Sequence, residues 1–225
     1  ELGYRVLVVD FDPQANATSA LGIDPRSVEK SMYDVILNDV NLRDCIIKSQ
    51  WEFLSVAPSN LDLAGAEIEL VSAFNRERLL DGAIASVISE YDFVLIDCPP
   101  SIGLLTVNAL TAASEVLVPI QCEYLALEGL GQLLSNVERV KTHLNKELHI
   151  STIALVMFDA RTKLAGQVVE EIRSHFGERV CQQTVPRSVR LSEAPSYGQP
   201  IIYYDSSSRG AIAYRSLAKE ITGGA

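Results

Sequence analysis

The sequence predicts an α/β fold, a doubly wound and mostly parallel sheet with helices on both faces. Short runs of β-branched and other apolar residues recur along the chain at intervals long enough to hold a helix. Several of these runs are apolar throughout, as strands buried on both faces are. Segments with apolar residues every three or four positions lie between them. Alternating strands and helices are typical of a parallel sheet covered on both sides.

Six segments are predicted as strands because they are short, apolar and rich in valine and isoleucine. The clearest helix is predicted where Leu130, Leu134 and Val137 share one face. We find no internal repeat and no interdomain linker, so residues 1–225 are predicted to form a single domain. The strands are expected at 6–9, 53–56, 93–96, 116–120, 150–157 and 180–185. The helices are expected at 61–74, 77–89, 104–113, 123–144, 164–176 and 211–221.

The composition narrows the functional classes. The chain has 225 residues, 48% of them hydrophobic, and a net charge of −10, which disfavours a protein that coats nucleic acid with its whole surface. Residues 187–225 nevertheless hold five basic and three acidic side chains, so a local basic face is possible there. No apolar run reaches the roughly 18 residues of a membrane span. The four cysteines are far apart, without metal-ligand spacing, so a reduced, cytoplasmic location is expected.

Acidic side chains stand at the ends of two predicted strands. Asp10 and Asp12 follow the first strand, where period-two alternation would put both on one side, and Asp97 follows the run 93–96. Ligands of open α/β sheets bind beyond the carboxyl ends of the strands, and carboxylates there can hold Mg²⁺ through its waters while substrate phosphates complete the shell. A nucleotide site is therefore predicted, although acids in these positions can also simply cap turns.

The residues after Asp12 leave two interpretations open, since Gln14, Asn16 and Thr18 are suited equally to helix capping and to ligand contact. A phosphate-binding loop of the form G-x-x-x-x-G-K-[ST] is missing, because no glycine in the sequence is followed by lysine. Glu1–Gly3 is expected to be the last turn of a helix, so the first strand and the phosphate loop would lie upstream. We expect the chain as printed to hydrolyse ATP weakly or not at all.

Several motifs resemble those of the ParA (Soj) partition ATPases, which have a deviant Walker A loop and belong to the MinD-like P-loop superfamily. The stretch 5–18 resembles the second nucleotide motif of that family, and 91–101 with 106–110 resembles its Walker B and switch II region. The match also covers 159–162 and 185–201. These segments read RVLVVDFDPQANAT, YDFVLIDCPPS, TVNAL, DART and VPRSVRLSEAPSYGQPI.

The resemblance implies a function in chromosome or plasmid partition. Mg²⁺ and ATP would drive homodimerisation, the dimer would bind DNA without sequence preference, and a ParB-like partner would stimulate hydrolysis. The intact protein would associate with the nucleoid and not with a membrane. A non-catalytic module that binds DNA or a partner after losing its phosphate loop is one alternative. A metabolic enzyme on a related scaffold, such as an amidoligase or an iron–sulfur reductase component, is the other.

The resemblance also implies roles for individual residues. Ala15 stands where the family usually has glycine, a change that should be tolerated if φ is negative at this position. The implied roles are Asp10 at the Mg²⁺ shell, Asp97 as a Mg²⁺ ligand through water, Asp12 as the catalytic residue that orients the attacking water, Pro186 and Arg187 in the adenine pocket, and Arg161 and Arg190 as DNA contacts.

Overall fold

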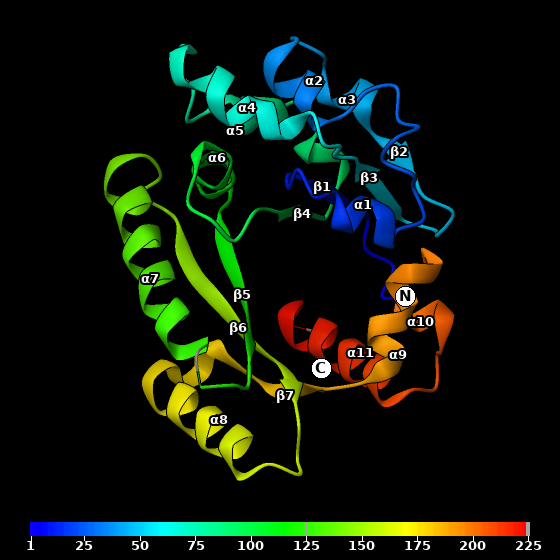
Figure 1. Cartoon of the computed structure of the whole chain (residues 1–225), viewed down its shortest axis with the longest axis vertical. Helices are drawn as coiled ribbons and strands as arrows, with labels where there is room; N and C mark the ends of the chain where they lie inside the picture. Colours follow the sequence, from blue (N-terminus) through cyan, green and yellow to red (C-terminus); the bar gives the residue numbers. More distant parts are fainter. Residues whose placement is uncertain (125, 224–225) are drawn as a thin grey trace. The chain divides into compact units, whose positions relative to one another are not determined.

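A computed structural model describes residues 1–124 and 126–223 of the chain (Figure 1). Their contacts divide the chain into two compact units, residues 1–113 and 114–225, and each unit has a sheet of its own. All six predicted strands are confirmed to within a residue or two. The strands are β1 (Val6–Asp10), β2 (Ile47–Lys48), β3 (Leu54–Ala57), β4 (Phe93–Asp97), β5 (Glu115–Gln121), β6 (His149–Phe158) and β7 (Val180–Pro186).

The sheet of the first unit has the strand order β2-β3-β1-β4. Strand β1 pairs in parallel with both β3 and β4, while β2 is antiparallel to β3. Pairing of β1 with β4 starts at Val6 opposite Phe93 and ends at Asp10 opposite Asp97. The register therefore brings the two predicted acids to the same edge of the sheet.

A large apolar cluster of the first unit lies on one face of this sheet. Leu7 and Val9 of β1 are fully buried and belong to one apolar cluster with side chains from α2, α4, α5 and α6. Alternation along the strand turns the residues on either side of Val8 to that face. The helices are α1 (Asn16–Ala20), α2 (Met32–Leu37), α3 (Leu42–Cys45), α4 (Leu63–Glu69), α5 (Leu79–Ala85) and α6 (Leu104–Ala112), with 3₁₀ turns η1 (Leu70–Ser72) and η2 (Ile88–Glu90).

The second unit has a parallel sheet in the order β5-β6-β7, with helices on both faces. Figure 1 shows α7 and α8 on one side of this sheet and α11 on the other. Ala154 of β6 packs with Ala213 and Leu217 of α11, while its neighbours Ile153 and Leu155 are fully buried. The helices are α7 (Ala126–His143), α8 (Lys163–Phe176), α9 (Val189–Glu193), α10 (Ile201–Tyr204) and α11 (Arg209–Ile221), with η3 (Gly177–Arg179) and η4 (Ala194–Tyr197).

The predicted helices are confirmed, although two are shorter than expected. The helix expected at 61–74 is α4 followed by η1, and that expected at 77–89 is α5 followed by η2. Residues 1–3 are not helical in the structure, although Gly3 has a φ of +84°. Within residues 1–124 and 126–223, no helix has the length and apolar character needed to cross a membrane.

Candidate functional site

The centre of the candidate site is the pair of carboxylates at the ends of β1 and β4. Asp10 and Asp97 are register partners on adjacent parallel strands, as their positions after two apolar runs predicted. The backbone continues this pairing for one more residue, because the Phe11 N–H donates to the Asp97 carbonyl at 2.7 Å. Phe11 is fully buried, which anchors the chain just after the first acid.

Asp10 is fully buried, and its carboxylate is held by Thr18 of α1. The Thr18 backbone N–H and side-chain hydroxyl both donate to Asp10 Oδ2, at 2.7 and 2.6 Å. The other oxygen, Oδ1, accepts the Asp12 N–H at 3.3 Å. Burial raises the pKa of Asp10, and the hydrogen bonds from Thr18 oppose that rise. A buried carboxylate needs such donors to stay charged.

The Thr18 hydroxyl links Asp10 to the loop after β3. This hydroxyl donates to Asp10 and accepts the backbone N–H of Ser59 at 3.0 Å. Thr18 and Ser59 are both fully buried, so the hydrogen bond between the Thr18 hydroxyl and the Ser59 N–H is shielded from water. The sequence left capping and ligand contact open for Thr18, and the structure shows a further role, since its side chain positions the Asp10 carboxylate.

Asp12 lies in a turn and not in the strand. Strand β1 ends at Asp10, so the alternation that was to put Asp10 and Asp12 on one side does not extend to Asp12. Its Oδ1 accepts the Gln14 N–H at 2.9 Å, which forms a local Asx turn. Within the part of the chain that the structure describes, Asp12 Oδ2 accepts no hydrogen bond. One oxygen of this carboxylate is therefore available to a water molecule.

The backbone at Ala15 differs from the expectation of a negative φ. Its φ is +52° and its ψ +38°, in the left-handed region, and it precedes α1 as the N-cap residue. A residue with a Cβ pays roughly 1–2 kcal/mol for this conformation, whereas glycine does not. The condition for tolerance is therefore not met, and the turn between Asp12 and Thr18 is strained at Ala15.

The Asp97 carboxylate has a pKa raised to about 6. Partial burial is the largest cause, and the negative charges of Asp10 and Asp12 add to it. Among the described residues, no group donates a hydrogen bond to the Asp97 side chain. The structure thus contains a carboxylate that lacks donors and lies beside two other acids, an arrangement that a cation would relieve.

The donor chemistry fits a hydrated Mg²⁺ ion. Asp10 and Asp97 supply hard carboxylate oxygens, which this ion prefers, and Mg²⁺ usually keeps several waters and takes one or two protein carboxylates. No cluster of three or more His, Cys, Asp or Glu that could enclose a metal occurs among residues 1–124 and 126–223. The pair can therefore contribute to a magnesium site, but the remaining ligands must come from water and substrate.

The loop from Cys98 to Gly103 joins Asp97 to α6 and is held from within α6. The Thr106 hydroxyl lies 2.6 Å from the Ser101 carbonyl and 3.1 Å from the Pro99 carbonyl, and so donates back to the loop. Gly103 is the N-cap residue of α6 and has no side chain with which to cap it. The sequence motif predicted a functional loop here, but gave no sign of what fixes it.

Pro186 and Arg187 stand at the carboxyl end of β7 in the second unit. Pro186 is the register partner of Phe158 at the end of β6, and the Arg187 N–H donates to the Phe158 carbonyl at 2.9 Å. The Arg187 guanidinium forms an ion pair with Glu123, which follows β5. The three parallel strands of this sheet thus end in a cluster of charged groups, the usual place for a ligand.

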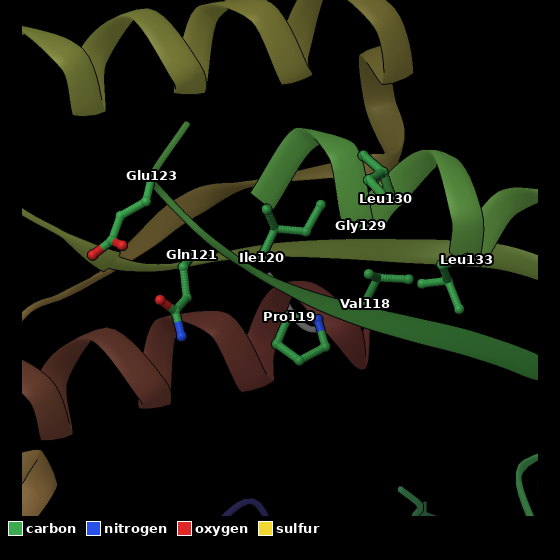
Figure 2. Close-up of a pocket in the computed structure, with 8 residues that line it drawn as sticks. All are labelled: Val118, Pro119, Ile120, Gln121, Glu123, Gly129, Leu130 and Leu133. Carbon is green, nitrogen blue, oxygen red and sulfur yellow. The ribbon is translucent and has the colours of Figure 1, made fainter. Parts of the chain in front are cut away.

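A pocket of about 410 Å³ lies beside β5, and Glu123 is one of its lining residues. Figure 2 shows Val118 and Ile120 on the side of the strand that faces Leu130 and Leu133 of α7, with Pro119 and Gln121 on the other side. The polar side chains of the lining are those of Gln121 and Glu123.

Arg161, one of the two predicted DNA contacts, is highly exposed but paired. Its guanidinium donates to both carboxylate oxygens of Asp159, at 2.9 and 2.7 Å, while 86% of the Arg161 side chain stays accessible. Hydrogen bonds from Arg161 are the main reason that the pKa of Asp159 falls to about 2. The exposure suits phosphate contact, but the adjacent carboxylate neutralises the charge.

Arg190, the other predicted DNA contact, is also held by acids. It pairs with Glu193 at 3.1 Å and Asp205 at 3.5 Å, and its guanidinium lies 6.0 Å from the centre of the Tyr204 ring. The Tyr204 hydroxyl donates to Glu193 at 3.2 Å, which closes the cluster. Arg161 and Arg190 are both on the second unit, whereas the three acids are on the first.

Sequence comparisons identify the family. The model described as AAA domain matches residues 1–150. The sporulation initiation inhibitor protein Soj of Bacillus subtilis is 53% identical over 220 residues, which cover 98% of this chain and 87% of that protein. The chromosome partitioning protein ParA of Myxococcus xanthus is 49% identical, over 96% of this chain and 77% of that protein. The chain belongs to the ParA/Soj family of partition ATPases. Its predicted membership is confirmed.

Solved structures that match this chain confirm its P-loop NTPase-like α/β fold. The cell division ATPase MinD of Pyrococcus furiosus matches with a TM-score of 0.80 and 25% identity, over 98% of this chain and 86% of that one. A protein called cobyrinic acid a,c-diamide synthase from Mycobacterium smegmatis, with bound ATP analog and magnesium, matches with a TM-score of 0.83 and 36% identity. That match covers 99% of this chain and 85% of the other.

Proposed function

We propose that this ParA/Soj family member is an ATPase of chromosome or plasmid partition that binds ATP together with Mg²⁺. The observation that carries the proposal is the register pairing of Asp10 with Asp97 at one edge of the sheet. Their raised pKa values point to a site that gains from a cation. The ATP analog and magnesium in the related structure from Mycobacterium smegmatis support the same ligands here.

The three acids take separate roles in this proposal. Asp97 would hold a magnesium water, since its carboxylate accepts no hydrogen bond from the described residues. Asp10 would contribute to the same shell from a fixed position, because Thr18 locks its carboxylate. Asp12 would orient the attacking water with its available oxygen. When bound, Mg²⁺ would neutralise charge on the phosphate oxygens, and phosphoryl transfer depends almost entirely on such electrostatic stabilisation together with positioning.

The second unit would supply the contacts to adenine and DNA. Pro186 and Arg187 at the end of β7 would bind the base, with Glu123 as the ion-pair partner that orients Arg187. Arg161 and Arg190 would contact DNA phosphates in an ATP-dependent homodimer. Because both arginines are paired with acids, we propose that each makes only a modest contribution. A ParB-like partner would stimulate hydrolysis and release the DNA.

The test is a DNA-binding assay on the full-length natural chain, over a range of salt concentrations, with and without Mg-ATP. We expect binding to require nucleotide and to weaken steeply with salt, since phosphate contacts release counterions. Arg161→Ala and Arg190→Ala should each weaken binding and reduce the salt dependence by about one phosphate contact. Arg179→Ala, which removes a cation from η3, is the control. Binding that ignores both nucleotide and salt would refute the partition function.

Assays on the same full-length protein also test the two alternative functions, a non-catalytic binding module and a metabolic enzyme. DNA binding without any Mg-dependent ATP hydrolysis would favour the non-catalytic module. The 36% identity to a protein called a diamide synthase makes an amidoligase worth measuring as well. ATP hydrolysis that depends on a carboxylic acid substrate and an amide donor, and not on DNA, would support that enzyme class instead.

A further inference from the structure

Helix α6 receives its N-terminal cap from a different helix. Its N-cap residue is Gly103, and its first turn contains no acidic residue. Glu67 of α4 reaches this end, where Glu67 Oε1 lies 3.5 Å from the Leu105 backbone nitrogen. A carboxylate at a helix N-terminus is stabilised by the unsatisfied N–H groups and the helix dipole.

The absence of a side chain at Gly103 leaves room for the Glu67 carboxylate. A Cβ at Gly103 would overlap the Glu67 side chain, 2.6 Å from both its Cδ and Oε2. The φ of Gly103 is −129° and its ψ −172°, an extended conformation that any residue adopts. The backbone therefore does not require glycine at this position, and the three atoms nearest to an added Cβ all belong to the Glu67 carboxylate group.

The loop that Glu67 contacts is the one that follows Asp97. Six residues, 98–103, connect Asp97 to α6, and Thr106 holds the middle of this loop through the Ser101 and Pro99 carbonyls. The Glu67 carboxylate lies against the last loop residue, Gly103, and accepts the Leu105 N–H in the first turn of α6. The loop is thus fixed from two independent directions, one from α6 and the other from α4.

We propose that Glu67 is a positioning residue, which sets the conformation of the loop 98–103 and thereby the placement of Asp97. This inference rests on the proposed function, in which Asp97 acts at the Mg-ATP site. Glu67 itself contacts neither nucleotide nor metal. Loss of its carboxylate leaves the Asp97 side chain intact but releases the end of the loop, so it lowers turnover more than nucleotide affinity.

The experiment uses full-length natural protein and the variants Glu67→Ala, Glu67→Gln and Gly103→Ala. Steady-state ATP hydrolysis gives kcat and KM, and hydrogen exchange reports on the amides of residues 101–106. We expect Glu67→Ala and Gly103→Ala to lower kcat about tenfold, within the roughly hundredfold that misplacement of reacting groups by about 1 Å costs, with KM changed less than about twofold. Exchange at 101–106 should accelerate. Glu67→Gln, which keeps an acceptor, should retain most of the original kcat and most of the original exchange protection at residues 101–106.

Two controls separate a positioning role of Glu67 from a general loss of stability. Glu69→Ala removes an exposed acid from the same helix, one bonded to the Tyr33 hydroxyl, and should leave kcat and the exchange at 101–106 unchanged. The double variant Glu67→Ala/Gly103→Ala should be no less stable than Glu67→Ala alone, because the clash at Gly103 is gone. Neighbouring residues that interact deviate from additivity in such a cycle.

Failure of the positioning role of Glu67 and failure of the proposed function would give different results. Unchanged exchange at residues 101–106 in Glu67→Ala, or unchanged kcat while the unmodified protein hydrolyses ATP, would overturn the role of Glu67. If the unmodified protein shows no Mg-dependent hydrolysis, the proposed function fails instead. The exchange measurement and the stability cycle still decide then whether Glu67 fixes the loop.

Discussion

At the scale of single residues, the candidate site depends on Thr18 as much as on the acids that the sequence singled out. An apolar run that ends in aspartate can be recognised by eye, so Asp10 and Asp97 were predictable. The partner of Asp10 was not, because Thr18 reaches it only through the turn between β1 and α1. The left-handed backbone at Ala15, which allows that turn, is equally invisible in a sequence that has alanine there.

Replacement of Thr18 should therefore be costly. Thr18→Val keeps the shape but removes the hydroxyl, which leaves the Ser59 N–H without an acceptor and Asp10 with one donor fewer. We expect the free energy of unfolding to fall by about 2–4 kcal/mol, since buried polar groups without partners cost roughly 1–3 kcal/mol each and charged ones more. Urea unfolding measures the loss. Thr18→Ser keeps the hydroxyl and should stay within about 1 kcal/mol of the original protein; an equal loss in both variants would contradict this role.

The raised pKa of Asp97 predicts an inverted pH dependence of stability. Its pKa rises from an ordinary 3.8 to about 6 in the folded protein, so between these values the folded state binds a proton that the unfolded chain releases. Stability of the metal-free protein should therefore fall as the pH rises from about 4 to about 6. Urea unfolding in EDTA across this interval should show the fall, and Asp97→Asn should reduce it and be more stable than the original protein at pH 7.

Asp92 provides a control of opposite sign. Hydrogen bonds from Arg5 hold its pKa at about 2, so its contribution is present above the ordinary value and is lost as the pH falls toward 2. Asp92→Asn should thus lower stability by a constant amount above about pH 4 and change the slope of the stability curve only below that pH. If the curves of Asp97→Asn and the original protein run parallel between pH 4 and 6, Asp97 titrates normally.

At the scale of elements, helices α5 and α6 of the first unit lack a cap from their own N-cap residue and receive a side chain from another helix instead. The N-cap residue of α5, Arg78, makes no side-chain cap, and Asn108 of α6 supplies one. Asn108 Oδ1 accepts the N–H groups of Leu79 and Leu80 at 3.0 and 3.3 Å. Helix α6 is thus capped by α4 and in turn caps α5, which ties the three helices together through polar contacts.

Asn108 should accordingly be one of the most sensitive positions in the first unit. It is fully buried, and its amide also donates to the carbonyls of Arg76 and Leu104 at 2.7 and 2.9 Å. Asn108→Ala leaves the N–H groups of Leu79 and Leu80 and the Arg76 carbonyl without this partner, so we expect a loss of about 3–5 kcal/mol in unfolding free energy. The matched control is Asn136→Ala in α7, which removes one side-chain bond to Gln132 and should cost less than about 1 kcal/mol. Similar losses in thermal or urea unfolding would refute the capping role of Asn108.

The elements that the sequence failed to predict are the short ones. Strands of continuous apolar residues and helices of two or more turns were located because their patterns repeat. Helices α1, α2 and α3 have only five, six and four residues, too few for a 3.6-residue period to be recognised. Strand β2 has two residues, both exposed. Such elements form because their neighbours bury or cap them, and local sequence does not carry that information.

At the scale of the whole molecule, ligand binding offers a test that does not depend on turnover. Mg-ATP at about one hundred times its dissociation constant should raise the free energy of unfolding by about 2.7 kcal/mol if it binds only the folded protein. Thermal unfolding of the full-length chain with Mg-ATP should show the rise, and removal of the metal with EDTA should abolish most of it. Asp97→Asn should also reduce the shift. An equal rise with and without EDTA would show that the carboxylate pair takes no part in binding.

The parallel pairing of β1 also determines when the sheet can form. Its first residue, Val6, pairs with Phe93, which is 87 residues further along the chain. A ribosome that adds roughly 5–20 residues per second needs about 4–17 s to make that stretch. During this time the strand that carries Asp10 has been synthesised and the strand that carries Asp97 has not. The two halves of the candidate site therefore come together only after more than ninety residues have been synthesised, and the apolar strand β1 must remain unpaired with β4 until then.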